Sequence, residues 1–143
     1  MSDTNSGEIK RIFESAPFIA DLGIQLDSIA PGECRTSLVL GRRHLQQDGY
    51  VHAGVQATMA DHTAGAAAAS LVASGQYVLS AEFSISLLRA AKGSHLTCVA
   101  RVLKAGSSLT VVESEVFCGT PEETRLVSKA KVTLAVVRPR DEK

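Results

Sequence analysis

Apolar and polar residues alternate in six segments of the chain, and this two-residue period predicts β-strands. In residues 95–105, for example, Leu96, Cys98 and Ala100 fall on one side of the strand. The six segments cover residues 22–30, 33–40, 77–88, 95–105, 108–119 and 125–138. Only short turns separate the last four segments, which predicts that they form an antiparallel meander.

Two other segments have a helical pattern. Residues 9–20 place Ile9, Ile12 and Phe13 on one face, which predicts a helix that ends near Pro17. Residues 54–73 are mostly Ala, Gly, Thr and Ser without proline, which predicts a long helix closed by Gly75.

One helix cannot cover a six-stranded sheet by standing beside it, so we expect the sheet to curl around the helix. Small side chains along residues 54–73 would let the two backbones approach closely. The pattern predicts an α+β fold in which a curled, mainly antiparallel sheet wraps around one long central helix. A plain helix-on-sheet α+β domain is the simpler alternative.

Composition narrows the class of protein. The chain has 143 residues, of which 45% are hydrophobic, and this fits one domain with a real core. We expect a flexible N-terminus at 1–8, a single domain at 9–138 and a polar tail at 139–143. Fifteen basic residues balance fifteen acidic residues, which argues against nucleic-acid and membrane partners.

The three cysteines are isolated, which argues against a disulfide framework and a structural zinc site. The N-terminal residues lack the apolar core of a signal peptide. We therefore expect a soluble cytoplasmic protein.

The candidate chemistry lies in the small-residue helix. Asp61 is the one carboxylate in residues 54–73, and small neighbours leave room for a ligand beside it. Such a carboxylate can attack a carbonyl or take a proton from water, although an exposed or hydroxyl-bound Asp is the plainer interpretation. Gly54 begins the helix, where a free N–H could bind an oxyanion; alternatively, this glycine only eases the turn.

The stretch "HLQQDGYVHAGVQATMAD", with its His-Ala-Gly and an Asp seven residues after the Gly, resembles the hotdog-fold acyl-CoA thioesterases. The similarity is strongest to the phenylacetate-degradation (PaaI-like) branch and covers about residues 10–138. It implies hydrolysis of an acyl-CoA or aryl-CoA thioester, with Asp61 as general base or nucleophile and the Gly54 amide as oxyanion donor. It also implies that Gln46 orients the water. No cofactor is expected, since coenzyme A is part of the substrate.

The chain departs from the family at Ala53, where relatives have glycine. If that glycine needed a positive φ, Ala53 would be strained. In relatives the amide of the second glycine faces the substrate, which places the donor at Gly54.

Further residues complete the predicted site. We expect His52 to hold the loop or polarise the thioester carbonyl, and Ser80 to hydrogen-bond water or Asp61. Arg89 and Lys92 are candidates for the coenzyme A phosphates, although exposed basic residues usually serve solubility. Candidate acyl-binding residues on or near the helix are Val51, Val55, Thr58 and Met59.

A metal site of His52, Asp61 and His62 is not expected, because Asp61 and His62 point about 100° apart on a helix.

Spacing along the helix predicts an assembly. Gly54 and Asp61 lie about 10 Å apart along the axis, but both must reach one thioester group. A substrate between two antiparallel helices would meet Gly54 of one chain and Asp61 of the other. We therefore expect a two-fold homodimer with shared sites, which relatives often pair into a homotetramer.

Two other functions compete with hydrolysis. A non-catalytic acyl-CoA-binding hotdog protein would act as a sensor or regulator. A hotdog dehydratase or hydratase usually shows a D-x-N-P-x-H-type segment or a His–Glu pair, and neither occurs here.

Overall fold

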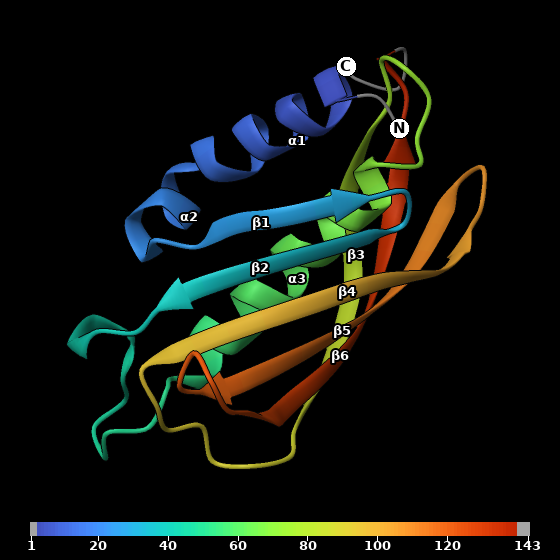
Figure 1. Cartoon of the computed structure of the whole chain (residues 1–143). Coiled ribbons are helices and arrows are strands. Elements are labelled where there is room, and N and C mark those ends of the chain that lie inside the picture. The colour runs from blue at the N-terminus through green and yellow to red at the C-terminus, as the bar shows by residue number, and fades with distance from the viewer. Residues whose placement is uncertain (1–2, 140–143) are drawn as a thin grey trace.

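The computed structural model describes residues 3–139, and six antiparallel strands form one sheet in it (Figure 1). The strands are β1 (Gln25–Ala30), β2 (Glu33–Val39), β3 (Tyr77–Leu87), β4 (His95–Ala105), β5 (Leu109–Gly119) and β6 (Thr124–Val137). Their order across the sheet is β1-β2-β4-β5-β6-β3. All six lie within the predicted segments to within a residue. β1 and β3 are the two edges of the sheet.

The predicted four-stranded meander is wrong at its first strand. β4, β5 and β6 do follow one another as hairpins, but β3 pairs with β6 and not with β4. The reason is the connection of residues 88–94, which is longer than the two hairpin turns and carries the chain across the end of the sheet. This topology leaves one side of β3 without a neighbouring strand in the described chain.

The long helix α3 (Ala53–Ala69) lies on the concave face and contacts all six strands, so the predicted curled sheet is confirmed (Figure 1). Ala60, Ala64 and Ala67 are fully buried at this contact, as small side chains allow. The helix ends at the Ser70 cap, earlier than predicted, and Gly75 belongs to the following turn, where its φ is 84°.

Two buried hydrogen bonds fix the height of α3 on the sheet. Thr63 Oγ1 lies 2.8 Å from Thr36 Oγ1 of β2. Ser114 Oγ of β5 donates to the carbonyl oxygen of Ala60 over 2.8 Å. Paired polar groups of this kind orient a buried helix more sharply than apolar contact does, so the position of Asp61 is well defined.

Two helices precede the sheet: α1 (Asp3–Ser15) and α2 (Pro17–Leu22). Pro17 ends α1, as predicted, and starts α2, since proline fits the first turn of a helix. α1 begins at Asp3, within the segment predicted as a flexible end. Ile9 and Phe13 are buried, and α1 packs on β1 and α3 (Figure 1).

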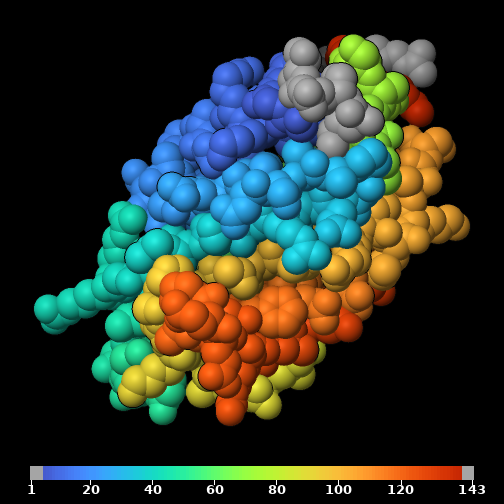
Figure 2. All heavy atoms as spheres, viewed as in Figure 1, coloured from blue at the N-terminus to red at the C-terminus, as the bar shows by residue number. Residues whose placement is uncertain are grey.

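A short 3-10 turn, η1 (Arg42–His44), opens the loop before α3, and residues 41–50 project from one end of the molecule (Figure 2). The three cysteines are free, buried thiols. Burial raises the pKa of the Cys34 and Cys98 thiols to about 12, so they serve packing and not chemistry. None of the described helices is long and apolar enough to cross a membrane.

Candidate active site

Asp61 is held by a neighbouring strand. Ser80 Oγ of β3 donates a hydrogen bond of 2.5 Å to Asp61 Oδ1, which confirms the contact predicted between the two side chains. Ser80 lies opposite Leu134, whose side chain is buried, and a β-bulge follows directly between Ser80 and Glu82. The hydroxyl fixes one carboxylate oxygen, and no described residue donates to Oδ2.

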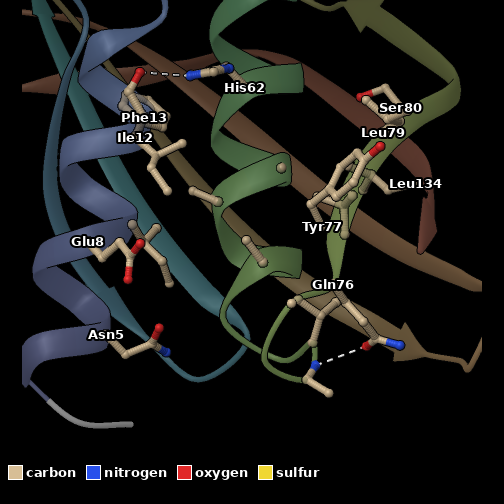
Figure 3. A pocket seen from close by; sticks show the side chains of 18 of the residues that line it. Asn5, Glu8, Ile12, Phe13, His62, Gln76, Tyr77, Leu79, Ser80 and Leu134 are labelled. Atoms are coloured by element: carbon tan, nitrogen blue, oxygen red, sulfur yellow. Dashed lines mark hydrogen bonds between the residues drawn. The ribbon is translucent and has the colours of Figure 1, made fainter. Parts of the chain in front are cut away.

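An open cavity of about 800 Å³ lies beside this pair, between α1, α3, residues 72–76 and the start of β3 (Figure 3). Ile12 and Phe13 line it from α1, and Leu79 and Leu134 line it from the sheet. Asn5 and Gln76 lie at the end far from Ser80, as Figure 3 shows. The cavity therefore runs from the Asp61 carboxylate along apolar walls to a polar end.

His62 shapes this cavity through its contact with α1. Its Nε2 lies 3.0 Å from the carbonyl oxygen of Phe13, and its ring lies 4.2 Å from the Phe13 ring, centroid to centroid. Burial lowers the pKa of His62. The contact ties α1 to α3 and so fixes one wall of the cavity. Local sequence gives no signal for it, because the partners are 49 residues apart.

The start of α3 differs from the prediction in one important respect. His52 is the N-cap of the helix, and its Nδ1 accepts a hydrogen bond from the Gly54 N–H over 2.8 Å. A Cβ at Gly54 would lie 3.0 Å from Nδ1, which is a tight contact, so glycine gives the ring room to approach. The Gly54 amide, predicted as oxyanion donor, is thus occupied by His52.

The free amide is that of Ala53. No described group accepts a hydrogen bond from the Ala53 N–H, which is the first of α3. An N–H at this position has no partner within its own helix and carries the positive end of the helix dipole. No described residue other than glycine has a positive φ, so Ala53 is not strained.

A second cavity, of about 380 Å³, opens beside Ala53. Gln46 and Arg89, two of the predicted site residues, line it together with Ala53. Gln46 Oε1 accepts hydrogen bonds from the N–H groups of Asp48 and Tyr50, which closes the loop and leaves the Nε2 group as donor.

The remaining predicted residues do not line the large cavity. Val51 is buried and borders the second cavity. Val55 and Met59 belong to the core. Thr58 is half-buried and bonds back to the Gly54 carbonyl. Lys92 is exposed and borders neither cavity.

The described chain therefore separates the site residues into two groups. Asp61 and Ser80 line the large cavity, whereas Gln46, Ala53 and Arg89 line the small one, and the two linings share no residue. Asp61 and Ala53 are eight positions apart on one helix, which is about 12 Å along its axis. A carboxylate and a free helix amide are the groups that acyl transfer needs, but here they face different cavities.

Sequence comparison finds a matching family profile and a similar protein. The sequence profile of the thioesterase superfamily matches residues 48–124. A 1,4-dihydroxy-2-naphthoyl-CoA hydrolase of Listeria monocytogenes is 27% identical over 119 residues, which is 83% of this chain and 94% of that protein.

Solved structures are similar over nearly the whole chain. A thioesterase family protein of Silicibacter pomeroyi has a TM-score of 0.88 and 30% identity, over 92% of this chain and 96% of that one. A thioesterase of Haemophilus influenzae has a TM-score of 0.83 and 20% identity, over 92% and 90%. These neighbours have the hotdog fold that the family resemblance implied.

Proposed function

The chain belongs to the thioesterase superfamily, and from this premise we propose that it hydrolyses an acyl-CoA or aryl-CoA thioester to the free acid and coenzyme A. The observation that carries the proposal is the Asp61 carboxylate, which Ser80 orients beside an open cavity of about 800 Å³. The relative from Listeria monocytogenes, which is named for an aryl-CoA ester, supports this substrate class.

Asp61 acts on the thioester carbon in one of two ways. As a base, Oδ2 takes a proton from water while the water oxygen attacks the carbonyl carbon; the C–S bond then breaks and the thiolate recovers the proton. As a nucleophile, Oδ2 attacks the carbonyl carbon and the C–S bond breaks, which releases the thiolate and leaves a mixed anhydride. Water then cleaves the anhydride to the free acid and the Asp61 carboxylate, and the thiolate takes up the remaining water proton. The Gln46 Nε2 group orients the water in this scheme.

In either route negative charge develops on the carbonyl oxygen. We assign the Ala53 N–H as the donor that stabilises it, in place of the Gly54 N–H, because the Gly54 N–H is already bonded to His52. One such donor contributes about 2.7–4 kcal/mol to transition-state stabilisation. His52 positions this amide by capping the helix.

The active site joins two subunits. Ala53 and Asp61 face different cavities of one chain, so the substrate meets Ala53 of one protomer and Asp61 of another. Edge strand β3 supports this arrangement: Phe83 and Leu87 lie opposite inward-facing residues of β6 but are 42% and 53% exposed. A second copy that pairs through β3 in antiparallel fashion would cover them and bring the two α3 helices face to face.

The substrate lies across both cavities. The acyl or aryl group occupies the apolar part of the large cavity, next to Ile12, Phe13 and Leu79. Arg89, in the small cavity, binds a phosphate of coenzyme A, and Lys92 offers a second charge further out. The His52–Asp61 spacing supports placement in the phenylacetate-degradation branch, and pairing of dimers into tetramers is expected.

A panel of acyl- and aryl-CoA esters with a thiol-trapping dye tests the proposal. We expect hydrolysis of at least one ester by the wild type and a loss of about 10²–10⁴-fold in Asp61→Asn, the usual contribution of a general base. Binding of these esters without turnover by the wild type would instead identify a non-catalytic acyl-CoA-binding protein.

A further inference from the structure

Gln56 carries a buried acceptor without a partner. Its side chain is 4% exposed, and its Nε2 donates to the Val51 carbonyl oxygen over 3.4 Å. No described group donates to its Oε1. Exchanging the amide oxygen and nitrogen would set two acceptors against each other, so the observed orientation is the favourable one.

An unpaired acceptor of this kind is costly in a folded core, because the oxygen has lost its water and gained nothing. Ser128 Oγ is the other buried polar side-chain atom without a partner in the described chain, and Ser128 lines neither cavity. Gln56 lines the small cavity together with Ala53 and Arg89. Gln56 therefore combines a buried acceptor that lacks a described partner with a place in the lining of this cavity.

The spacing between Gln56 and Ala53 fits the chemistry of a coenzyme A ester. Residues three apart on a helix are neighbours, with about 5–6 Å between their Cβ atoms, and helical side chains lean toward the N-terminus. In the thiol arm, two methylene groups separate the sulfur from an amide N–H. Bond lengths place that N–H roughly 4–5 Å from the thioester carbonyl.

Two other side chains of the small cavity can accept a hydrogen bond: Gln46, whose Oε1 already accepts two backbone N–H groups, and Tyr50. The other walls of the cavity include Val51, Leu87, Leu88 and Ala91, which have apolar side chains. A donor buried there needs an acceptor, just as the Gln56 oxygen needs a donor.

We propose that Gln56 Oε1 accepts a hydrogen bond from the first amide N–H of the coenzyme A arm while the Ala53 N–H holds the thioester carbonyl. Gln56 then selects esters whose thiol carries an amide two carbons from the sulfur. This inference rests on the proposed thioesterase function and adds a substrate-binding residue to it.

The experiment compares three esters of one acyl group that the wild type accepts. The first is the coenzyme A ester, and the second is the N-acetylcysteamine ester, which keeps the amide. The third is the 4-oxopentyl thioester, in which a CH2 replaces only the N–H. We expect the wild type to lose about tenfold or more in kcat/KM from the amide ester to the ketone ester, as loss of a buried hydrogen bond predicts.

The variants are Gln56→Met, which keeps the length of the side chain but not the acceptor, and Gln47→Met, a matched change in the exposed loop. Gln56→Met should lower kcat/KM about tenfold for the amide ester and for the coenzyme A ester, and should keep kcat/KM for the ketone ester within about twofold of the wild-type value. Gln47→Met should leave kcat/KM unchanged for all three esters. A general loss of packing would lower kcat/KM equally for all three, so a loss that depends on the ester indicates a lost binding contact.

Equal rates of the wild type on the amide and ketone esters would overturn the inference, as would equal losses on both in Gln56→Met. The comparison of the amide and ketone esters with the wild type tests the inference even if Gln56→Met does not fold. Turnover of the coenzyme A ester in either case would leave the proposed function intact. No turnover of any ester would refute the proposed function itself, and the inference with it.

Discussion

Ala53→Pro removes one N–H group from the protein and little else. Proline has no amide hydrogen, and it is favoured at the first position of a helix, which Ala53 occupies. The preceding residue must be extended, and His52 already has φ −60° and ψ 138°. We therefore expect a folded variant that lacks only the proposed oxyanion donor.

The expected magnitudes for activity and stability point in opposite directions. Loss of one preorganised donor costs about 2.7–4 kcal/mol at the transition state, so kcat should fall about 10²–10³-fold. The free energy of unfolding should stay the same or rise by about 0.4–1 kcal/mol, because proline restricts the unfolded chain. A large loss of activity without a loss of stability is a signature that a packing defect does not give.

The assay is steady-state hydrolysis of the best acyl-CoA ester, together with thermal unfolding of the same samples. Ala53→Ser is the matched control, because it changes the side chain and keeps the N–H; it should stay within about threefold of the wild type in kcat, since the transition-state donor is retained. Wild-type activity in Ala53→Pro would refute the assignment and return the role to the Gly54 amide, which His52 would then have to release.

Three further predictions concern Ser80, His62 and the edge strand. Ser80→Ala removes a hydrogen bond to a charged group, worth about 1.5–3 kcal/mol, and should lower kcat about tenfold or more. Ser80→Thr keeps the hydroxyl and should retain most activity. Equal losses in the two variants would contradict the role of the hydroxyl. Burial lowers the pKa of His62 from its ordinary 6.5, so its contribution to stability is complete above pH 6.5 and is lost as the pH falls through the lowered value. Thermal unfolding between pH 8 and pH 5 should therefore show a smaller acid-induced drop in melting temperature for His62→Gln than for the wild type, and identical drops would show that another group titrates. Phe83→Glu at the exposed edge should yield a folded protein that is a monomer by light scattering at micromolar concentration and that has no thioesterase activity. An active monomer would disprove the shared site.

Periodicity alone was enough to find the strands and the central helix. A strand with one buried face has an apolar residue at every second position, and a helix with one buried face has apolar residues with a period of 3.6. It could not place β3 beside β6, since pairing between distant segments depends on how the chain crosses the sheet. The same limit hid the start of α1 at Asp3. Helix formation there accompanies packing of α1 on α3, a contact between segments far apart in the chain.

The site shows a similar division. Asp61 was visible as the lone carboxylate of a small-residue helix, and its contact with Ser80 followed from the family resemblance. The donor was not visible, because it depends on the ring of His52 turning back onto the Gly54 N–H. The free amide at Ala53 and the unpaired oxygen of Gln56 are both consequences of side-chain orientation, which a residue pattern does not encode.

Mixing two inactive variants tests most directly whether two chains build each active site. Ala53→Pro and Asp61→Asn are unfolded together in equal amounts, refolded and assayed. If one chain supplies the amide and the other the carboxylate, each hybrid dimer contains one intact site, and random pairing restores about a quarter of wild-type activity. If both groups come from the same chain, the mixture shows no more activity than the two variants measured separately, and the account is wrong.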